Sequence, residues 1–216
     1  MLEERIQKHL DLLVERYPKL YACKEDIEKA YLILEDCYVN DHKLLIAGNG
    51  GSAADSEHIA GELMKKFKLP RPVPTDFADK LRTIDKERGE NLSKKLEGGL
   101  IAIPLVAHEA LTTAYINDVD GLGVFAQQLY VFGRPGDVFL GISTSGNSKN
   151  VMSATVVARA LRLKVIGLTG AKGGELATAA DVVIKVPETE TYMIQELHLP
   201  VYHCLCLMLE DRFFGE

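Results

Sequence analysis

The sequence predicts an α/β protein built on a five-stranded parallel sheet. After residue 40, short runs rich in leucine, isoleucine and valine alternate with segments of helical pattern. Buried parallel strands are usually near-continuous apolar runs, and their alternation with helices is typical of right-handed βαβ units. The predicted strands are KLLIA (43–47), LIAIPL (100–105), DVFLGI (137–142), KVIGL (164–168) and VVIKV (182–186).

Helices are predicted before, between and after these strands. Two amphipathic helices, at about 2–17 and 24–39, come first because apolar residues recur there every three or four positions. A last helix, at about 190–213, is apolar almost all round, so we expect it to be buried on more than one side, partly by other subunits. The helices between the strands are predicted at about 52–67, 108–116, 122–132, 148–161 and 173–180.

Segment 68–99 interrupts this alternation. It holds three prolines followed by a charged run without a strand, and it is too long for an ordinary connection. A lid over a site, a local helical excursion and a solvated insertion all fit. We treat residues 1–216 as one domain, with a helical pair at 1–40 and an insertion at 68–99.

Composition narrows the class of protein. The 216 residues are 47% hydrophobic and 26% charged, as in one globular domain, and the net charge of −6 does not favour nucleic acid or anionic lipid. The most apolar stretch, near the C-terminus, is shorter than the ~20 residues of a membrane span, and no signal-peptide pattern opens the chain. The four cysteines form no CxxC pair, so we expect buried, reduced thiols and a cytoplasmic protein.

Two strand-to-helix turns carry anion-binding patterns. The first strand ends in AGNGGS (47–52), where glycines allow backbone N–H groups to approach an anion at a helix N-terminus. This string also fits a loose dinucleotide pattern, but the acidic residue expected about 20 positions later is missing, which disfavours a nicotinamide cofactor.

The third strand ends in GISTSGNS (141–148), which supplies four hydroxyl groups before a helix. Hydroxyls and main-chain donors can surround a phosphate, although Ser and Thr could also simply cap the helix. Because ligands bind at the carboxyl ends of parallel strands, the two turns together predict a phosphorylated ligand.

Possible acid–base residues lie on two helices. His58 and Glu62 are four residues apart and so share a face, and Gln195 and His203 lie on the last helix. His198, on the same helix, is interpreted as a hydrogen-bonded core residue. A carboxylate, an imidazole and a phosphate cradle match proton transfer on a sugar phosphate.

These motifs resemble the SIS (sugar isomerase) domain proteins and, among them, the phosphoheptose isomerases. The similarity covers most of the chain outside 68–99. The matching strings are AGNGGSAADSEHIAGEL (47–63), IND (116–118), GDVFLGISTSGNSKNV (136–151), KVIGLTGAKGGELA (164–177) and IQELHLPVYH (194–203).

The resemblance implies conversion of sedoheptulose 7-phosphate to D-glycero-D-manno-heptose 7-phosphate in a homotetramer with active sites at subunit contacts. It implies a flavodoxin-like strand order, 2-1-3-4-5, and proton transfer by Glu62 and His203. It further implies zinc held by His58, Glu62, Gln195 and His203. The substrate-binding residues that it implies are Asn49, Gly50, Gly51, Ser52, Asn117, Asp118, Ser143, Thr144, Ser145, Ser148 and Gln195.

Residue chemistry supports this reaction but complicates the zinc site. Glu62 would remove a proton from the carbon beside the carbonyl, and His203 would move the oxygen's proton through an enediol. If Glu62 bound zinc, its basicity would fall. Gln195 and His203 are eight residues apart, about 12 Å of helix rise, and Pro200 between them is expected to kink the helix.

Departures from the family pattern leave two alternatives open. Lys66 stands where many members have arginine, Tyr192-Met193 replace a frequent Asp-Arg pair, and segment 68–99 is longer than usual. Another sugar phosphate is therefore one alternative. The other is a non-catalytic tetrameric scaffold like those that bind the replication initiator DnaA, although such scaffolds lack the acid–base pair.

Overall fold

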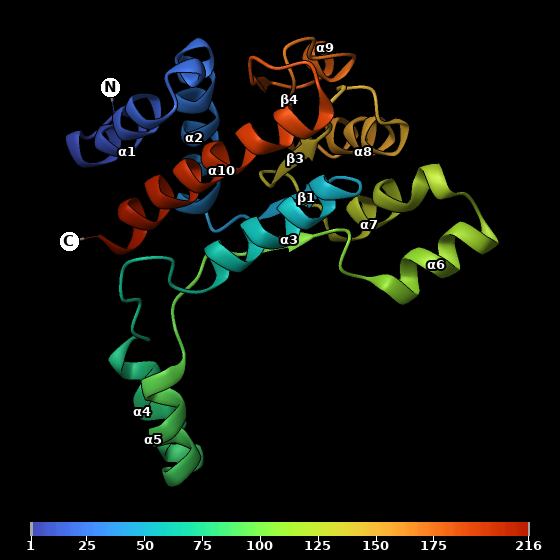
Figure 1. The fold of residues 1–216 in the computed structure, drawn as a ribbon. Coiled ribbons are helices and arrows are strands. Elements are labelled where there is room, and N and C mark those ends of the chain that lie inside the picture. The colour runs from blue at the N-terminus through green and yellow to red at the C-terminus, as the bar shows by residue number, and fades with distance from the viewer. Residues whose placement is uncertain (1, 216) are drawn as a thin grey trace.

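The computed structural model describes residues 2–215 and contains the predicted parallel sheet (Figure 1). Its strand order, β2-β1-β3-β4-β5, is the flavodoxin-like order implied by the resemblance, and every strand pair is parallel. The loops that follow the strands therefore meet at one edge of the sheet. The strands are β1 (Leu44–Ala47), β2 (Ala102–Pro104), β3 (Val138–Ile142), β4 (Lys164–Thr169) and β5 (Val182–Lys185).

The helices match the predicted ones with small shifts at their ends. The 173–180 prediction is the poorest, because the glycines at 173 and 174 adopt positive φ angles of 71° and 58° that delay the start of α9. The helices are α1 (Glu4–Arg16), α2 (Lys24–Val39), α3 (Gly51–Met64), α6 (Glu109–Asp118), α7 (Val124–Phe132), α8 (Lys149–Ala160), α9 (Leu176–Ala179) and α10 (Thr191–Phe214), with 3-10 turns η1 (Pro18–Cys23) and η2 (Gly121–Gly123).

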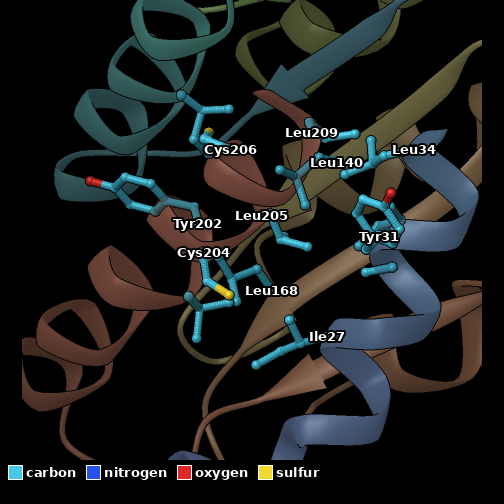
Figure 2. Packing of buried hydrophobic residues seen from close by; sticks show 14 of the residues in the cluster. Ile27, Tyr31, Leu34, Leu140, Leu168, Tyr202, Cys204, Leu205, Cys206 and Leu209 are labelled. Atoms are coloured by element: carbon cyan, nitrogen blue, oxygen red, sulfur yellow. The ribbon is translucent and has the colours of Figure 1, made fainter. Parts of the chain in front are cut away.

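Helices cover both faces of the sheet. Alternate residues of β1 point to opposite sides: Leu44 and Ile46 join a core with α1, α2, α3 and α10, and Leu45 joins a second core with α7, α8 and α9. Figure 2 shows the first core, where Leu205 and Leu209 of α10 face Tyr31 of α2. The apolar surface of α10 is thus largely buried within one chain, and its composition does not require a partner subunit. The helix also runs through Pro200 as one continuous element.

Segment 68–99 forms helices, as expected for a local helical excursion, which was one of its three predicted forms. Its two helices, α4 (Thr75–Ile84) and α5 (Lys86–Lys95), pack as a hairpin that projects away from the sheet (Figure 1). Gly89 permits this packing, because a Cβ there would collide with the carbonyl of Leu81. The base of the hairpin is closed by a bridge between Pro72 and Glu97.

Two further expectations concern thiols and membrane segments. Cys23, Cys37, Cys204 and Cys206 are all buried and free, as predicted. Across residues 2–215, we find no helix with both the length and the apolar content needed to span a membrane.

Candidate functional site

The glycine-rich turn joins β1 to α3 and is held to a neighbouring helix. Gly50 has φ +56°, a conformation that favours glycine. The side-chain amides of Asn49 and Asn150 exchange hydrogen bonds of 3.0 and 2.8 Å, which tie this turn to the first turn of α8. A Cβ on Gly51 would lie 2.6 Å from Gln195 Nε2, so Gln195 sits at the first turn of α3, and Ser52 is buried beside it.

The serine-rich turn joins β3 to α8 and folds on itself. The Ser143 and Ser148 hydroxyls lie 2.9 Å apart, and Ser145 Oγ accepts a hydrogen bond of 3.1 Å from the Asn147 N–H. Gly146 has φ +69°, and any side chain there would collide with the backbone at Gly173. The turn therefore packs against the loop that follows β4, as the strand order requires.

A cavity of about 260 Å³ opens between these loops and the start of α10. Its wall combines hydroxyl-bearing residues with one basic residue, Lys172, and one acidic residue, Glu188, and Lys172 was not among the predicted site residues. The signal was present, because Lys172 follows a third strand of the same sheet and so had to reach the same edge. The lining residues are Thr144, Ser145, Asn147, Gly170, Ala171, Lys172, Glu188, Thr189, Thr191 and Ile194.

The predicted acid–base residues come together farther along α3 and α10, which run side by side (Figure 1). His58 Nε2 lies 3.2 Å from Glu62 Oε1, and the His58 and His203 rings pack edge to face with centroids 5.0 Å apart. The Glu62 side chain is 14% exposed, and its second oxygen accepts a 3.1 Å hydrogen bond from Lys65. A carboxylate and two imidazoles therefore share one partly desolvated region.

His203 has the features of an unsatisfied functional group. Its ring packs against Phe67 and Tyr202, and its buried Nε2 has no hydrogen-bond partner. Burial lowers the pKa of His203, the charge of His58 lowers it further, and Glu62 opposes both effects. The imidazole is therefore held neutral at neutral pH.

His198 lies in the core as predicted. Neither ring nitrogen makes a hydrogen bond of good geometry, but the backbone of Thr169 lies close enough to act on the ring as a weak partner. Burial lowers its pKa to about 4, so the ring stays neutral.

Three predicted site residues do not join the acid–base cluster within this chain. Asn117 and Asp118 lie exposed at the end of α6, a helix with no buried residue, and Asn117 Nδ2 donates to Asp118 Oδ1 at 2.8 Å. Gln195 lies beside Gly51, whereas His203 lies beside His58, two turns farther along. Among residues 2–215, no three His, Cys, Asp or Glu side chains are arranged so that they could hold a metal ion.

The site thus has two parts joined by α10. The first turn of α10 borders the hydroxyl-lined cavity, and the middle of α10 carries His203 near Glu62. The arrangement can hold an anionic group at one end and transfer protons at the other. The two ends are about 12 Å apart, because an α-helix rises about 1.5 Å per residue.

Comparisons with known proteins agree with this architecture. Residues 97–170 match the SIS domain family. A phosphoheptose isomerase of Geotalea daltonii is 40% identical over 94% of this chain and 88% of its own length, and one of Akkermansia muciniphila is 34% identical over 99% and 100%.

Solved structures of similar proteins have the same fold. The phosphoheptose isomerase of Neisseria gonorrhoeae superimposes with a TM-score of 0.69 at 33% identity, covering 95% of this chain and 98% of that one. That of Francisella tularensis gives 0.75 at 28% identity, covering 96% and 97%. Identity at this level over nearly the full length of both chains means that the protein belongs to the phosphoheptose isomerase family of SIS domain proteins.

Proposed function

We propose that the protein is an aldose–ketose isomerase that converts sedoheptulose 7-phosphate to D-glycero-D-manno-heptose 7-phosphate. The observation that carries the proposal is that Glu62 and His203 both lie beside His58, about two helical turns from a hydroxyl-lined cavity. A heptose 7-phosphate carries its reacting carbons and its phosphate at opposite ends of the molecule. That shape suits a site whose anion-binding and proton-transfer parts are separated along α10.

The phosphate would bind in the cavity beside the serine-rich turn. Ser145 and Thr144 offer hydroxyl donors, Lys172 offers a positive charge, and the N-terminus of α8 adds its dipole. Asn49 would orient the glycine-rich turn through its amide pair with Asn150. These contacts fix one end of the substrate and leave the other free to reach α3.

The reaction itself needs a base and a proton carrier. Glu62 removes a proton from C1 of the ketose while His203 protonates the carbonyl oxygen at C2, giving a 1,2-enediol. His203 then takes the proton from the oxygen on C1, and Glu62 returns its proton to C2. A lowered His203 pKa suits this role because the neutral ring can donate one proton and regain another.

We also propose that His58, Glu62 and His203 turn towards a zinc ion and hold it when the metal binds. In the structure they lie close together and the buried Nε2 of His203 lacks a partner, but they are not yet arranged as a metal site. Imidazole and carboxylate are ligands that zinc accepts, and a bound zinc would stabilise negative charge on the substrate oxygens. Gln195 lies too far along α10 to complete this set in the present arrangement. Elemental analysis of protein purified without chelator tests the zinc proposal, which full activity without zinc would contradict.

We further propose a homotetramer in which α6 of one subunit reaches the site of another. Helix α6 exposes Leu111 and Ile116 and carries Asn117 and Asp118 away from the acid–base cluster. Mixing inactive Glu62→Gln and Asp118→Ala proteins should restore activity if the sites are shared between subunits. A monomeric mass in sedimentation would contradict the assembly. Four free buried thiols support a cytoplasmic location, which cell fractionation would test.

The activity is tested by assaying a panel of sugar phosphates, which also separates an isomerase from a scaffold. Sedoheptulose 7-phosphate should be the best substrate. Glu62→Gln should reduce turnover by at least about 100-fold, as expected for loss of a general base. Ser145→Ala should act mainly through substrate binding. Normal turnover by Glu62→Gln would contradict the mechanism.

A further inference from the structure

Asp55 and Tyr202 form a hydrogen-bonded chain that ends on His58, and the proposed reaction gives neither residue a role. Tyr202 is 2% exposed, and its hydroxyl donates to Asp55 Oδ1 at 3.3 Å. The Tyr202 hydroxyl oxygen also lies 3.0 Å from His58 Nδ1. Figure 2 shows the Tyr202 hydroxyl pointing away from the hydrophobic cluster that surrounds Leu205.

The number of available protons limits which group donates in each of these two hydrogen bonds. A phenol has one proton to donate, and an ionised Asp55 carboxylate is a stronger acceptor for that proton than a neutral imidazole nitrogen. The hydroxyl oxygen can therefore only accept from His58, which requires the histidine proton to be on Nδ1. A neutral ring with its proton on Nδ1 leaves a lone pair on Nε2, the atom that lies 3.2 Å from Glu62 Oε1.

Asp55 is placed to keep the Tyr202 hydroxyl donating to its carboxylate. Its Oδ2 is buried and has no hydrogen-bond partner, so Tyr202 is the side chain that satisfies the carboxylate. Burial raises the pKa of Asp55 above its ordinary value, and the Tyr202 hydrogen bond opposes this shift. The phenol thus favours the ionised carboxylate that accepts its proton.

We propose that Asp55 and Tyr202 are positioning residues that fix His58 in the tautomer with its proton on Nδ1 and its Nε2 lone pair facing Glu62. In this tautomer, His58 cannot donate a hydrogen bond to Glu62, so Glu62 Oε1 stays free to accept from another donor. The space between His58 Nε2 and Glu62 Oε1 is then lined by two acceptors and suits a cation. The effect on turnover rests on the proposed isomerase function, whereas the tautomer itself does not.

The test measures the tautomer directly. Two-bond ¹H–¹⁵N spectra of protein labelled in its six histidine rings distinguish Nδ1 from Nε2 protonation at about pH 8, above the ordinary histidine pKa. Loss of one set of signals in His58→Gln assigns His58. Wild-type protein should show His58 protonated on Nδ1.

Two variants should reverse the tautomer for different reasons. In Tyr202→Phe, Nδ1 loses its acceptor, so His58 should carry its proton on Nε2 and donate to Glu62. In Asp55→Ala, the Tyr202 hydroxyl is free to donate to Nδ1, which gives the same tautomer with the phenol still present. Both variants should lower kcat by about 10- to 100-fold, with a smaller change in KM, as expected for residues that orient a functional histidine.

Tyr38→Phe is the matched control. Tyr38 is also a buried tyrosine, 7% exposed, and its hydroxyl donates to the carbonyl of Ile101 at 3.2 Å, outside the cluster around His58. This variant should change neither the tautomer nor kcat. A wild-type His58 protonated on Nε2 would overturn the proposal, as would an unchanged tautomer in both Tyr202→Phe and Asp55→Ala. Lack of isomerase activity in the wild type would overturn the proposed function but leave the tautomer result standing.

Discussion

Replacing Arg71 with methionine should destabilise the protein more than any exposed ion-pair change, because Arg71 and Glu210 form a fully buried pair. Their side chains are 0% and 1% exposed, and Arg71 Nη2 lies 3.0 Å from Glu210 Oε1. Arg71 also donates to the carbonyl of Leu63 at 2.7 Å, at the end of the helix that carries Glu62. Glu210 accepts from the N–H of Phe67 at 2.8 Å.

The expected cost follows from leaving a charge without its partner. Removing one member of a buried pair typically costs about 3–5 kcal/mol, because the remaining charge stays desolvated. Arg71→Met should therefore lower the free energy of unfolding by about that amount. Glu210→Gln added to Arg71→Met should recover part of the loss, because a neutral amide still accepts from the backbone and leaves no charge unpaired. The coupling energy should be about 2–3 kcal/mol.

Urea unfolding followed by circular dichroism measures these energies at a fixed protein concentration, so that any oligomerisation is held constant. Arg82→Met is the control, because Arg82 pairs with Glu90 at 2.7 Å on the exposed α4–α5 hairpin. It should cost less than about 1 kcal/mol. If Arg71→Met costs no more than Arg82→Met, or if the double variant is simply additive, the reasoning about the buried pair is wrong.

Two further predictions concern His198 and Lys172. The folded-state pKa of His198 is about 4 against about 6.5 when unfolded, so the unfolded chain alone gains a proton between these values. The wild type should lose about 3 kcal/mol of stability as pH falls from about 6.5 to 4, and His198→Met should lose less in urea titrations; equal losses would exclude His198 as the cause. Lys172→Gln should raise the KM for sugar phosphate and weaken inhibition by inorganic phosphate, with a smaller effect on kcat; unchanged inhibition would remove Lys172 from the phosphate site.

Local patterns in the sequence predicted most of the fold. Apolar runs such as DVFLGI (137–142) located the buried strands, and the spacing of His58 and Glu62 placed both on one face of a helix. Glycines at positive φ explain why α9 begins later than its sequence pattern predicts. The helical hairpin at 68–99 was one of several possibilities, because its charged pattern is typical of both helices and solvated loops.

Long-range contacts were harder to predict. Tyr202 fits an apolar helical pattern, and only the packing of α10 against α3 brings its hydroxyl to Asp55 and His58. The sequence around Arg71 is typical of a proline-rich loop, yet Arg71 is buried against Glu210, a residue far from it in the sequence. The all-round apolar character of α10 suggested subunit contacts, whereas helices of the same chain supply much of its burial.

Turnover of sedoheptulose 7-phosphate in deuterated water, followed by NMR, tests most directly whether Glu62 on α3 and His203 on α10 transfer protons on one substrate. The wild type should produce the aldoheptose phosphate with deuterium at C2. Glu62→Gln and His203→Gln should bind the ketose phosphate yet form almost no product. Rapid product formation by either variant would contradict a proton-transfer role for the replaced residue.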